Sequence, residues 1–342
     1  MSYGHIPADR PAVTVGGGQL AKTRTRRTIG LDEVNEVAHQ IEANVSSVVV
    51  GKADVVRSAL VALLAEGHLL IEDVPGVGKT LLAKALARSI DCSVSRVQFT
   101  PDLLPSDVTG VTVYSPDTGE FEFKPGPVFA NIVIGDEINR AGPKTQSSLL
   151  ECMEERTVTI DGTTHELGSP FMVMATQNPI ELEGTYPLPE AQRDRFLMRL
   201  SIGYPDADDE VNVLRTHGHG DVLAQLRPVA KAETIAAMIE AVRGVHVSDS
   251  IERYIVAVCR ATRSHEHVEL GASPRASLAL LRATRSHAVL VGRDHVLPDD
   301  IKAIGPHLLP HRLILRPEAQ LAGRSAFDAV TDVLEGVPAP VE

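Results

Sequence analysis

A glycine-rich loop placed between an apolar run and a helical pattern constrains the fold of this chain more than any other feature. The loop, residues 73–80, reads Asp-Val-Pro-Gly-Val-Gly-Lys-Thr, and the apolar run before it covers residues 69–71. Residues 81–87 follow with helical periodicity. A strand, such a loop and a helix in this order are typical of a Walker A motif, whose backbone N–H groups and helix N-terminus bind phosphate oxygens. The chain is therefore predicted to have an α/β fold that binds a nucleoside triphosphate.

Residues inside the loop have separate predicted roles. Lys79 is expected to reach the β- and γ-phosphates, and the hydroxyl of Thr80 is expected to ligate Mg²⁺. The loop departs from the usual pattern at its first position, where Asp73 stands in place of glycine. The other residues expected to contact the phosphates, through their backbone, are Gly76, Val77 and Gly78.

The second motif, residues 131–137, is an apolar run that ends in Asp136 and Glu137. Such a run predicts a buried parallel strand, and open α/β sheets bind ligands at the carboxyl ends of their strands. Asp136 is expected to hold the Mg²⁺ shell and Glu137 to polarise the attacking water. The alternative is that the two acids only cap the following helix, whose first turn favours negative charge. The phosphate loop upstream favours the catalytic interpretation, so hydrolysis of the nucleotide is predicted.

Composition narrows the classes of function. The 342 residues carry a formal net charge of −12, and only 4% of them are aromatic, with no tryptophan. A surface that stacks nucleic-acid bases needs aromatic side chains, and a DNA-binding surface needs an excess of positive charge. The composition therefore disfavours both classes of function.

Cysteine spacing and the length of apolar segments indicate the compartment. Three cysteines without CxxC spacing indicate a reducing compartment and no zinc site: Cys92, Cys152 and Cys259. No apolar segment is long enough to cross a bilayer, and the N-terminus lacks a signal-peptide core, so a cytoplasmic protein is expected.

Three regions with different patterns divide the chain. Residues 1–28 are glycine-rich and basic without apolar periodicity, which predicts a disordered tail. Residues 29–205 alternate helical patterns with apolar runs, which predicts a parallel sheet flanked by helices. Residues 206–342 show only helical periodicity, so a helical second domain is predicted. The expected strands of the core cover residues 69–71, 95–100, 131–134, 171–175 and 199–202.

Two β-hairpins are predicted to interrupt the core. The first joins residues 112–114 to residues 121–123, and the second joins residues 157–160 to residues 163–167 through an Asp-Gly turn. Asp-Gly between alternating runs is a strong hairpin signal. Because isolated hairpins need a partner for stability, these are either projections with a working role or simple decoration of a sheet edge.

Further polar residues stand at the ends of predicted elements. Asn178 follows the apolar run at residues 171–175, where its amide is placed to orient the lytic water. Arg193 and Arg195 precede the last predicted strand, and an ordinary surface ion pair is expected for Arg193. Arg275 follows a Ser-Pro helix-start signal in the helical region.

The order of these motifs resembles that of the AAA+ ATPases, and among them the MoxR type. The resemblance runs from about residue 41 to about residue 315, and the sequence of residues 72–80 itself resembles that of the MoxR type. It implies a P-loop AAA+ core with two hairpin inserts, the helix-2 insert and the pre-sensor-1 hairpin, followed by a helical lid. By this resemblance Asn178 is sensor 1, and Arg275 is sensor 2 on the lid. Arg195 is the arginine finger, which completes the site of a neighbouring subunit.

The family implies a ring, with a hexamer as the expected form, that hydrolyses the β–γ phosphoanhydride of ATP with Mg²⁺. The resemblance implies a chaperone-like role, in which ATP hydrolysis serves to remodel or mature client protein complexes with a von Willebrand factor A-type partner. The alternative is the motor subunit of a metal chelatase, which has a similar core. An activator that remodels RNA polymerase is disfavoured, because the first hairpin lacks a Gly-Ala-Phe-Thr-Gly-Ala loop. A helicase is disfavoured because residues 112–127 hold one basic residue, Lys124.

Overall fold

The computed structural model describes residues 28–74, 76–178, 184–217 and 222–340. At its centre lies a five-stranded sheet in the order β2-β5-β8-β1-β9, in which every neighbouring pair is parallel. Because all the strands run in one direction, their last residues share one edge, here named the carboxyl edge, and their first residues share the amino edge. The strands are β1 (Leu69–Glu72), β2 (Val94–Gln98), β5 (Ile132–Asp136), β8 (Met172–Gln177) and β9 (Met198–Leu200).

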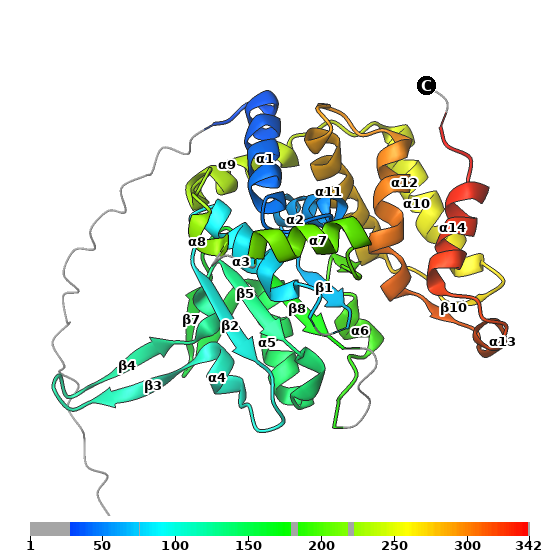
Figure 1. Ribbon diagram of the computed structural model, residues 1–342. Coiled ribbons are helices and arrows are strands. Elements are labelled where there is room, and N and C mark those ends of the chain that lie inside the picture. The colour runs from blue at the N-terminus through cyan, green and yellow to red at the C-terminus, as the bar shows by residue number, and fades with distance from the viewer. Residues whose placement is uncertain (1–27, 75, 179–183, 218–221, 341–342) are drawn as a thin grey trace, which may run out of the picture.

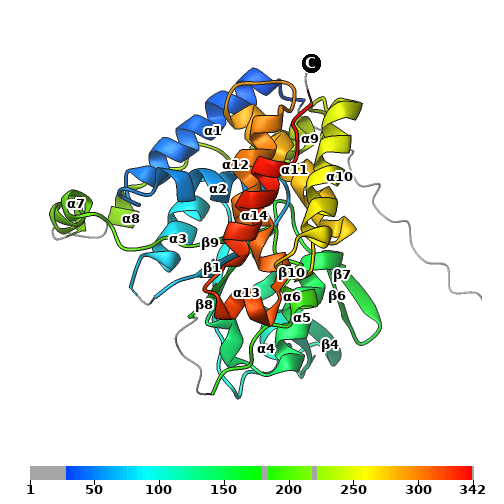
Figure 2. The same ribbon diagram turned by 90° about the vertical axis from the view of Figure 1, so that its right-hand side faces the viewer.

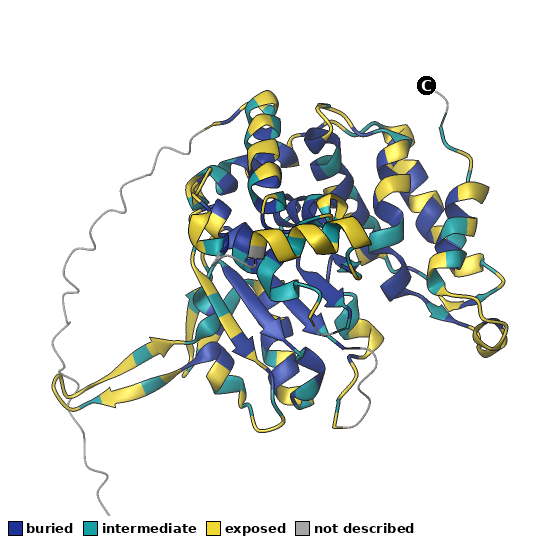
Figure 3. Ribbon diagram, viewed as in Figure 1, coloured by how far each residue is buried: buried dark blue, intermediate teal, exposed yellow. Residues whose placement is uncertain are grey.

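The central strands are apolar because helices cover both faces of the sheet. In β1, Leu69 and Ile71 belong to the larger cluster of core side chains, whereas Leu70 belongs to the smaller one on the other face. This division follows from the pleat, which turns successive side chains to opposite faces. Figure 3 shows the middle strands β5, β8 and β1 buried, whereas β2 at the edge of the sheet is largely exposed. The five strands predicted from the sequence are confirmed, with small shifts at their ends.

Helices flank the sheet (Figure 1). α1 shows why these segments are helical, because Val34, Ala38, Ile41 and Val45 recur at helical spacing and form one buried stripe. The helices and helical turns of this part are α1 (Leu31–Ser46), α2 (Ala53–Leu64), α3 (Lys79–Ser89), α4 (Pro105–Thr109), η1 (Pro127–Phe129), η2 (Ile138–Arg140), α5 (Pro143–Glu155) and α6 (Glu190–Arg193).

Both predicted hairpins are present, and each forms a two-stranded sheet of its own. β3 (Gly110–Ser115) pairs with β4 (Glu120–Pro125), and the pairing is antiparallel. β6 (Thr157–Ile160) pairs with β7 (Thr163–Glu166) in the same way. Figure 1 shows β3–β4 extending away from the body of the molecule.

The second hairpin turns as its sequence predicts and contacts the first. Asp161 and Gly162 have φ of 49° and 79°, the left-handed conformation that an Asp-Gly hairpin turn requires. The rings of Phe123 on β4 and His165 on β7 stack with their centroids 4.1 Å apart. The two hairpins are therefore in direct contact near their bases.

The C-terminal region is mostly helical, as predicted. Its helices and helical turns are α7 (Ala207–His217), α8 (Val222–Gln225), α9 (Ala232–Arg243), α10 (Asp249–Ser264), α11 (Pro274–Leu290), α12 (Pro298–Leu308), η3 (Pro310–Arg312), α13 (Pro317–Leu321) and α14 (Ala326–Gly336). α9 and α11 contact α1 and α2, which joins this region to the first helices of the chain. Figure 2 shows α12 and α14 side by side. Among the described residues, every helix is too short or too polar to span a lipid bilayer.

The expectation of helices alone in residues 206–342 is wrong in one detail. β10 (Val268–Leu270) and β11 (Ile314–Leu315) pair as a small antiparallel sheet. Strands of three and two residues are too short to produce an alternating pattern in the sequence. The predicted tail lies outside the described residues except for residue 28, so its disorder stays a prediction. We propose the boundary between core and lid near residue 205, between the end of β9 and the start of α7.

Candidate active site

The phosphate loop lies at the carboxyl edge, between the end of β1 and the start of α3. Gly76 and Gly78 have φ of 87° and 95°, a left-handed conformation that residues with a side chain rarely adopt. A Cβ at either position would meet no atom within 4 Å, so the glycines serve the backbone shape and leave open space around the loop. Val77, which lies between the two glycines, packs against the larger core cluster and so anchors the loop. Lys79 and Thr80 open α3, whose first N–H groups favour an anion.

The Lys79 amine is held by the loop itself. It donates to the backbone carbonyl of Asp73 at 2.6 Å and to that of Val74 at 3.3 Å. Burial lowers the pKa of Lys79, and three nearby carboxylates oppose this shift: those of Asp73, Asp136 and Glu137. The amine therefore stands between the loop and the acidic motif, where it can turn from the carbonyls to a phosphate by a side-chain movement.

Asp73, the departure from the usual loop pattern, ties the loop to the segment that follows β9. One carboxylate oxygen accepts the N–H of Val74 at 2.8 Å, and the other accepts the N–H of Gly203 at 2.6 Å and the hydroxyl of Ser201 at 3.0 Å. Burial alone would raise the pKa of Asp73, but these donors lower it below its usual value. The charged side chain is thus a structural tether between the phosphate loop and the connection to α7.

The acidic motif stands at the same edge, two strands away from β1. Asp136 ends β5 and is buried; its carboxylate forms an ion pair with Nε of Arg96 at 2.6 Å and accepts the hydroxyl of Thr176 at 3.3 Å. Glu137 follows with φ of 58°, a left-handed conformation that costs a residue with a side chain on the order of 1 kcal/mol. Its N–H donates to Thr176 Oγ1 at 3.0 Å, which fixes this turn.

The Glu137 carboxylate is oriented by two donors. Oε2 accepts Nε2 of Gln98 at 3.0 Å and Nε of Arg140 at 2.9 Å. Sequence reasoning missed Gln98, because it ends a different strand and only the sheet register, Gln98 opposite Asp136, brings it here. Arg140 lies three residues after Glu137 on η2, a spacing that could have suggested the contact.

Asn178 completes this side of the sheet. It is buried and follows the last residue of β8, the strand between β5 and β1. The backbone carbonyl of Gln177 accepts the N–H of Asp73 at 3.2 Å, so the end of β8 is bonded to the start of the phosphate loop. The sheet therefore brings Asn178, the acidic motif and the phosphate loop to one edge, as the sequence predicts.

The donors at this edge fit a nucleoside triphosphate with Mg²⁺. An open glycine loop at a helix N-terminus suits phosphate oxygens, and Lys79 adds a positive charge. Mg²⁺ prefers oxygen ligands, and the hydroxyl of Thr80 and the carboxylate of Asp136 are of this kind. Arg96 bonds only Oδ2 of Asp136, so Oδ1, which accepts the Thr176 hydroxyl, is the oxygen that could ligate the ion.

The two predicted arginines lie together at the opposite edge. Arg195 stands just before β9, whose Met198 pairs with Leu69, the first residue of β1. Arg275 stands in the first turn of α11 and, like Arg195, forms an ion pair with the carboxylate of Glu154 near the end of α5. The Arg195 Nη2 to Glu154 Oε2 distance is 3.1 Å. Since the phosphate loop follows the last residue of β1, the length of that strand, roughly 10 Å, separates it from this pair.

A buried network fixes the segment that carries Arg195. Its neighbour Asp194 accepts Nε of Arg312 at 2.7 Å and the hydroxyl of Ser273 at 3.1 Å, and Ser273 caps α11. Arg312 also donates to the backbone carbonyl of Phe196 at 2.6 Å. Burial lowers the pKa of Arg312 to about 10. Sequence reasoning missed Arg312 and Glu154, because no local pattern marks either residue.

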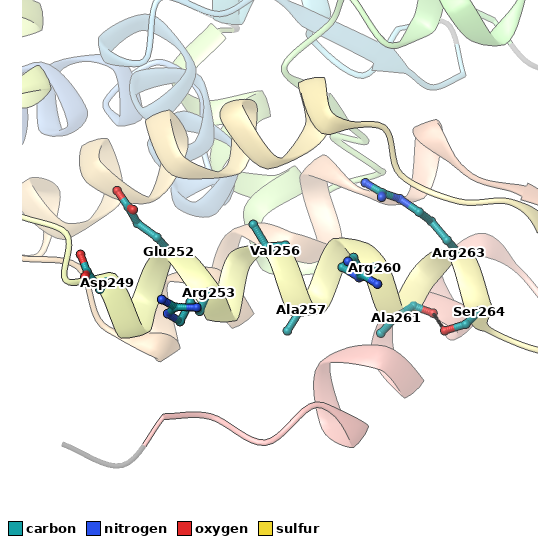
Figure 4. Close-up of a pocket in the computed structure, with 9 residues that line it drawn as sticks. All are labelled: Asp249, Glu252, Arg253, Val256, Ala257, Arg260, Ala261, Arg263 and Ser264. Atoms are coloured by element: carbon teal, nitrogen blue, oxygen red, sulfur yellow. Dashed lines mark hydrogen bonds between the residues drawn. The ribbon is translucent and has the colours of Figure 1, made fainter.

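Positive charge is in excess around this pair. A hollow of about 540 Å³ opens here, and the charged residues among those that line it are Arg156, Arg195, Arg243, Arg275, Arg282 and Arg312 with Glu66, Glu154 and Asp194. Such a site suits an anion. A larger groove of about 1190 Å³ runs along α10 (Figure 4), but it is lined by α10 alone and holds no predicted site residue.

Arg193 forms an ion pair with Glu190 at 3.5 Å, as predicted.

Comparisons with known proteins agree with this geometry. The model of the "ATPase family associated with various cellular activities (AAA)" matches residues 68–198, and that of the "AAA lid domain" matches residues 260–333. Two curated relatives are similar over nearly their whole length. "Chaperone MoxR1" of Mycobacterium tuberculosis is 40% identical over 99% of this chain and 93% of its own. "Protein MoxR" of Methylorubrum extorquens is 32% identical over 91% and 97%.

Two further proteins are similar over most of the chain. The uncharacterised protein YeaC of Bacillus subtilis is 52% identical over 87% of this chain and 93% of its own. A crystal structure of a candidate ATPase from Cytophaga hutchinsonii superposes with a TM-score of 0.85 at 39% identity. That match covers 90% of this chain and 96% of the other.

Proposed function

Because this chain belongs to the MoxR-type AAA+ ATPases, we propose that it hydrolyses ATP in a ring, with a hexamer as its form, to remodel or mature client protein complexes. The observation that carries the proposal is the separation of the two half-sites on opposite edges of one sheet. An arginine pair that lies away from its own phosphate loop can serve the loop of a neighbouring subunit. Such head-to-tail contacts close into rings.

The carboxyl edge supplies the groups for water attack on ATP. Lys79 and the loop N–H groups hold the phosphates, and Glu137 takes the proton of the attacking water, which Asn178 orients. The water oxygen forms a bond to the γ-phosphorus as the bond to the β–γ bridging oxygen breaks, which gives ADP and phosphate. Mg²⁺, when bound through Thr80 and Asp136, neutralises charge on the β- and γ-phosphates.

The amino edge supplies positive charge to the neighbour's ATP. The γ-phosphoryl group spreads negative charge over its oxygens during transfer, and a planar guanidinium can bond two of these oxygens at once. Arg195, from the core, and Arg275, from the lid, are the two side chains proposed to do so. Since they come from different parts of the subunit, hydrolysis at their shared phosphate would shift the lid against the core.

The β3–β4 hairpin is the element proposed to contact the client. Its tip carries an edge-to-face pair, Tyr114 and Phe121, with ring centroids 5.4 Å apart, and Phe121 is 74% exposed. An exposed aromatic residue on a projecting element is typical of a protein contact. The contact between Phe123 and His165 would pass movement from the second hairpin, next to β8, to this tip.

A partner protein and a cellular compartment complete the proposal. A von Willebrand factor A-type protein is proposed as the partner because the family resemblance implies it. A reducing cytoplasm is proposed because the three cysteines, all within the described residues, form no disulfide with one another.

Affinity capture with Glu137→Gln tests the proposal, because this variant should bind ATP without releasing it as products. Cell extract is passed over the variant with and without ATP, and Lys79→Ala is the control that should not bind the nucleotide. Retention of a von Willebrand factor A-type protein with a cofactor-dependent enzyme, only with ATP and only on Glu137→Gln, is expected. Retention of tetrapyrrole enzymes would favour the chelatase alternative. Identical retention on both variants would contradict a nucleotide-driven client cycle.

A further inference from the structure

One carboxylate joins the two arginines of the amino edge. Glu154 Oε2 lies 3.1 Å from Nη2 of Arg195, and its Oε1 contacts Nη2 of Arg275. Arg195 belongs to the core and Arg275 to the lid, so Glu154 bridges the two parts of the subunit. The three side chains are 33%, 30% and 43% exposed in the order Glu154, Arg195 and Arg275, so the group lies at the surface.

The side chains around this pair add positive charge, which a carboxylate between the two guanidinium groups offsets. Two guanidinium groups repel each other, and the hollow beside them contains further arginines, among them Arg156 and Arg282. The network around Asp194 fixes the backbone beside Arg195, but it does not hold the two guanidinium groups together. Glu154 does so with one oxygen for each, which is also how two oxygens of a phosphate would meet them.

We propose that Glu154 is a positioning residue for the ATP site of the neighbouring subunit. It holds Arg195 and Arg275 side by side on the ring interface, so that both are ready to reach the same γ-phosphate. This rests on the proposed function, in which the arginines act on a neighbour's ATP. Because the ion pairs are partly exposed and screened by water, their contribution to folding is small and their contribution to orientation is the one that matters.

The direct test replaces Glu154 by glutamine, which keeps the shape of the side chain and removes its charge. In Glu154→Gln we expect kcat for ATP hydrolysis to fall about tenfold, because misplaced catalytic groups act poorly. The dissociation constant of a fluorescent ATP analogue and the thermal midpoint are expected to stay unchanged, because the phosphate loop is at the other edge. Glu155→Gln is the matched control: Glu155 is the next residue, exposed at the same helix end, and its variant should retain wild-type kcat.

Mixed rings separate a positioning role from a local structural one. Lys79→Ala subunits should not bind ATP, but they carry intact arginines. Mixed with Glu154→Gln, they should restore turnover at the Glu154→Gln sites next to them. A structural defect inside the Glu154→Gln subunit would gain nothing from such a neighbour.

Arg195→Ala mixed with Lys79→Ala is the reference for these outcomes. If that mixture recovers activity but the Glu154→Gln mixture does not, the positioning role is wrong and the proposed function stands. A wild-type kcat in Glu154→Gln would likewise show that the positioning role is wrong while the proposed function stands. If neither mixture recovers although rings form, the arginines do not act across subunits, and both the proposed function and this inference are overturned.

Discussion

The two edges of the central sheet carry different halves of the candidate site and hold them by different means. At the carboxyl edge the loop glycines, the N-terminus of α3 and the acids at the end of β5 are placed by the backbone of the strand ends and the loop. At the amino edge the groups are long arginines held by carboxylates from other elements. A half-site whose groups are placed by the backbone is complete within one chain. Long side chains at the surface, by contrast, can reach the nucleotide of a neighbouring chain. Under the proposed function, one chain therefore binds the nucleotide at its carboxyl edge and supplies arginines from its amino edge to the site of another chain.

The largest effect is expected from Arg195→Ala, which removes the proposed arginine finger of the amino edge. A finger of this kind contributes about 10³-fold or more to kcat, so a loss of that order is expected. Binding of a fluorescent ATP analogue should be unchanged, because the carboxyl edge is untouched. Arg193→Ala is the matched control, since Arg193 pairs only with Glu190 on its own short helix among the ion pairs described. Normal turnover by rings of Arg195→Ala would remove the basis for two separate half-sites.

The variant Glu137→Gln tests the carboxyl edge of the sheet. Glu137 is the proposed general base, and loss of such a base costs about 10²–10⁴-fold in rate, so kcat should fall while ATP still binds. The two mixing partners should then behave differently. Lys79→Ala subunits should not rescue this variant, because both defects lie at the carboxyl edge. Arg195→Ala subunits should regain turnover at their own sites, because Glu137→Gln neighbours carry intact arginines; rescue by both partners would contradict the assignment of Glu137.

Sequence reasoning reached the carboxyl edge far better than the amino edge, and the physics of each explains this. A phosphate loop and an acidic strand end are local patterns, and parallel strands must bring their ends to one edge. Glu154 and Arg312 have no local pattern, because their partners come from distant parts of the chain: Glu154 pairs with Arg195 and Arg275, and η3, which carries Arg312, packs against β9. The arginines were noted from their places beside predicted elements, but their roles came only from the family resemblance, and their joint contact with Glu154 could not be read from it.

Asp73→Ala tests whether the carboxyl edge depends on its tether. The change leaves the N–H of Gly203 and the hydroxyl of Ser201 without their acceptor, which costs about 1–3 kcal/mol of unfolding free energy. The phosphate loop should also bind ATP less tightly, because its start is no longer bonded to the segment after β9. Urea unfolding and titration with an ATP analogue measure the two effects. Asp208→Ala, an exposed change in the first turn of α7, is the control; equal stability of both variants would show that the tether contributes nothing.

The smallest expected effect is a pH dependence that belongs to the amino edge. Burial lowers the pKa of His68, just before β1, to about 4, although its ring bonds the backbone carbonyl of Met153 and the N–H of Val173. Between that value and the ordinary pKa near 6.5 the unfolded chain binds the proton and the folded one does not, so stability falls as pH drops. From pH 7 to pH 5.5 the loss attributable to His68 is about 1 kcal/mol.

His311, also buried beside β9, has a pKa well below its ordinary value and adds to the same trend, so His68→Gln is compared with the wild type at each pH. Glutamine can keep both hydrogen bonds without titrating. The variant should lose less unfolding free energy than the wild type over this range in urea unfolding experiments. At the carboxyl edge the pKa of Asp73 is already below its usual value, so that group stays charged throughout. An equal loss in variant and wild type would mean that this pH dependence does not arise from His68 at the amino edge.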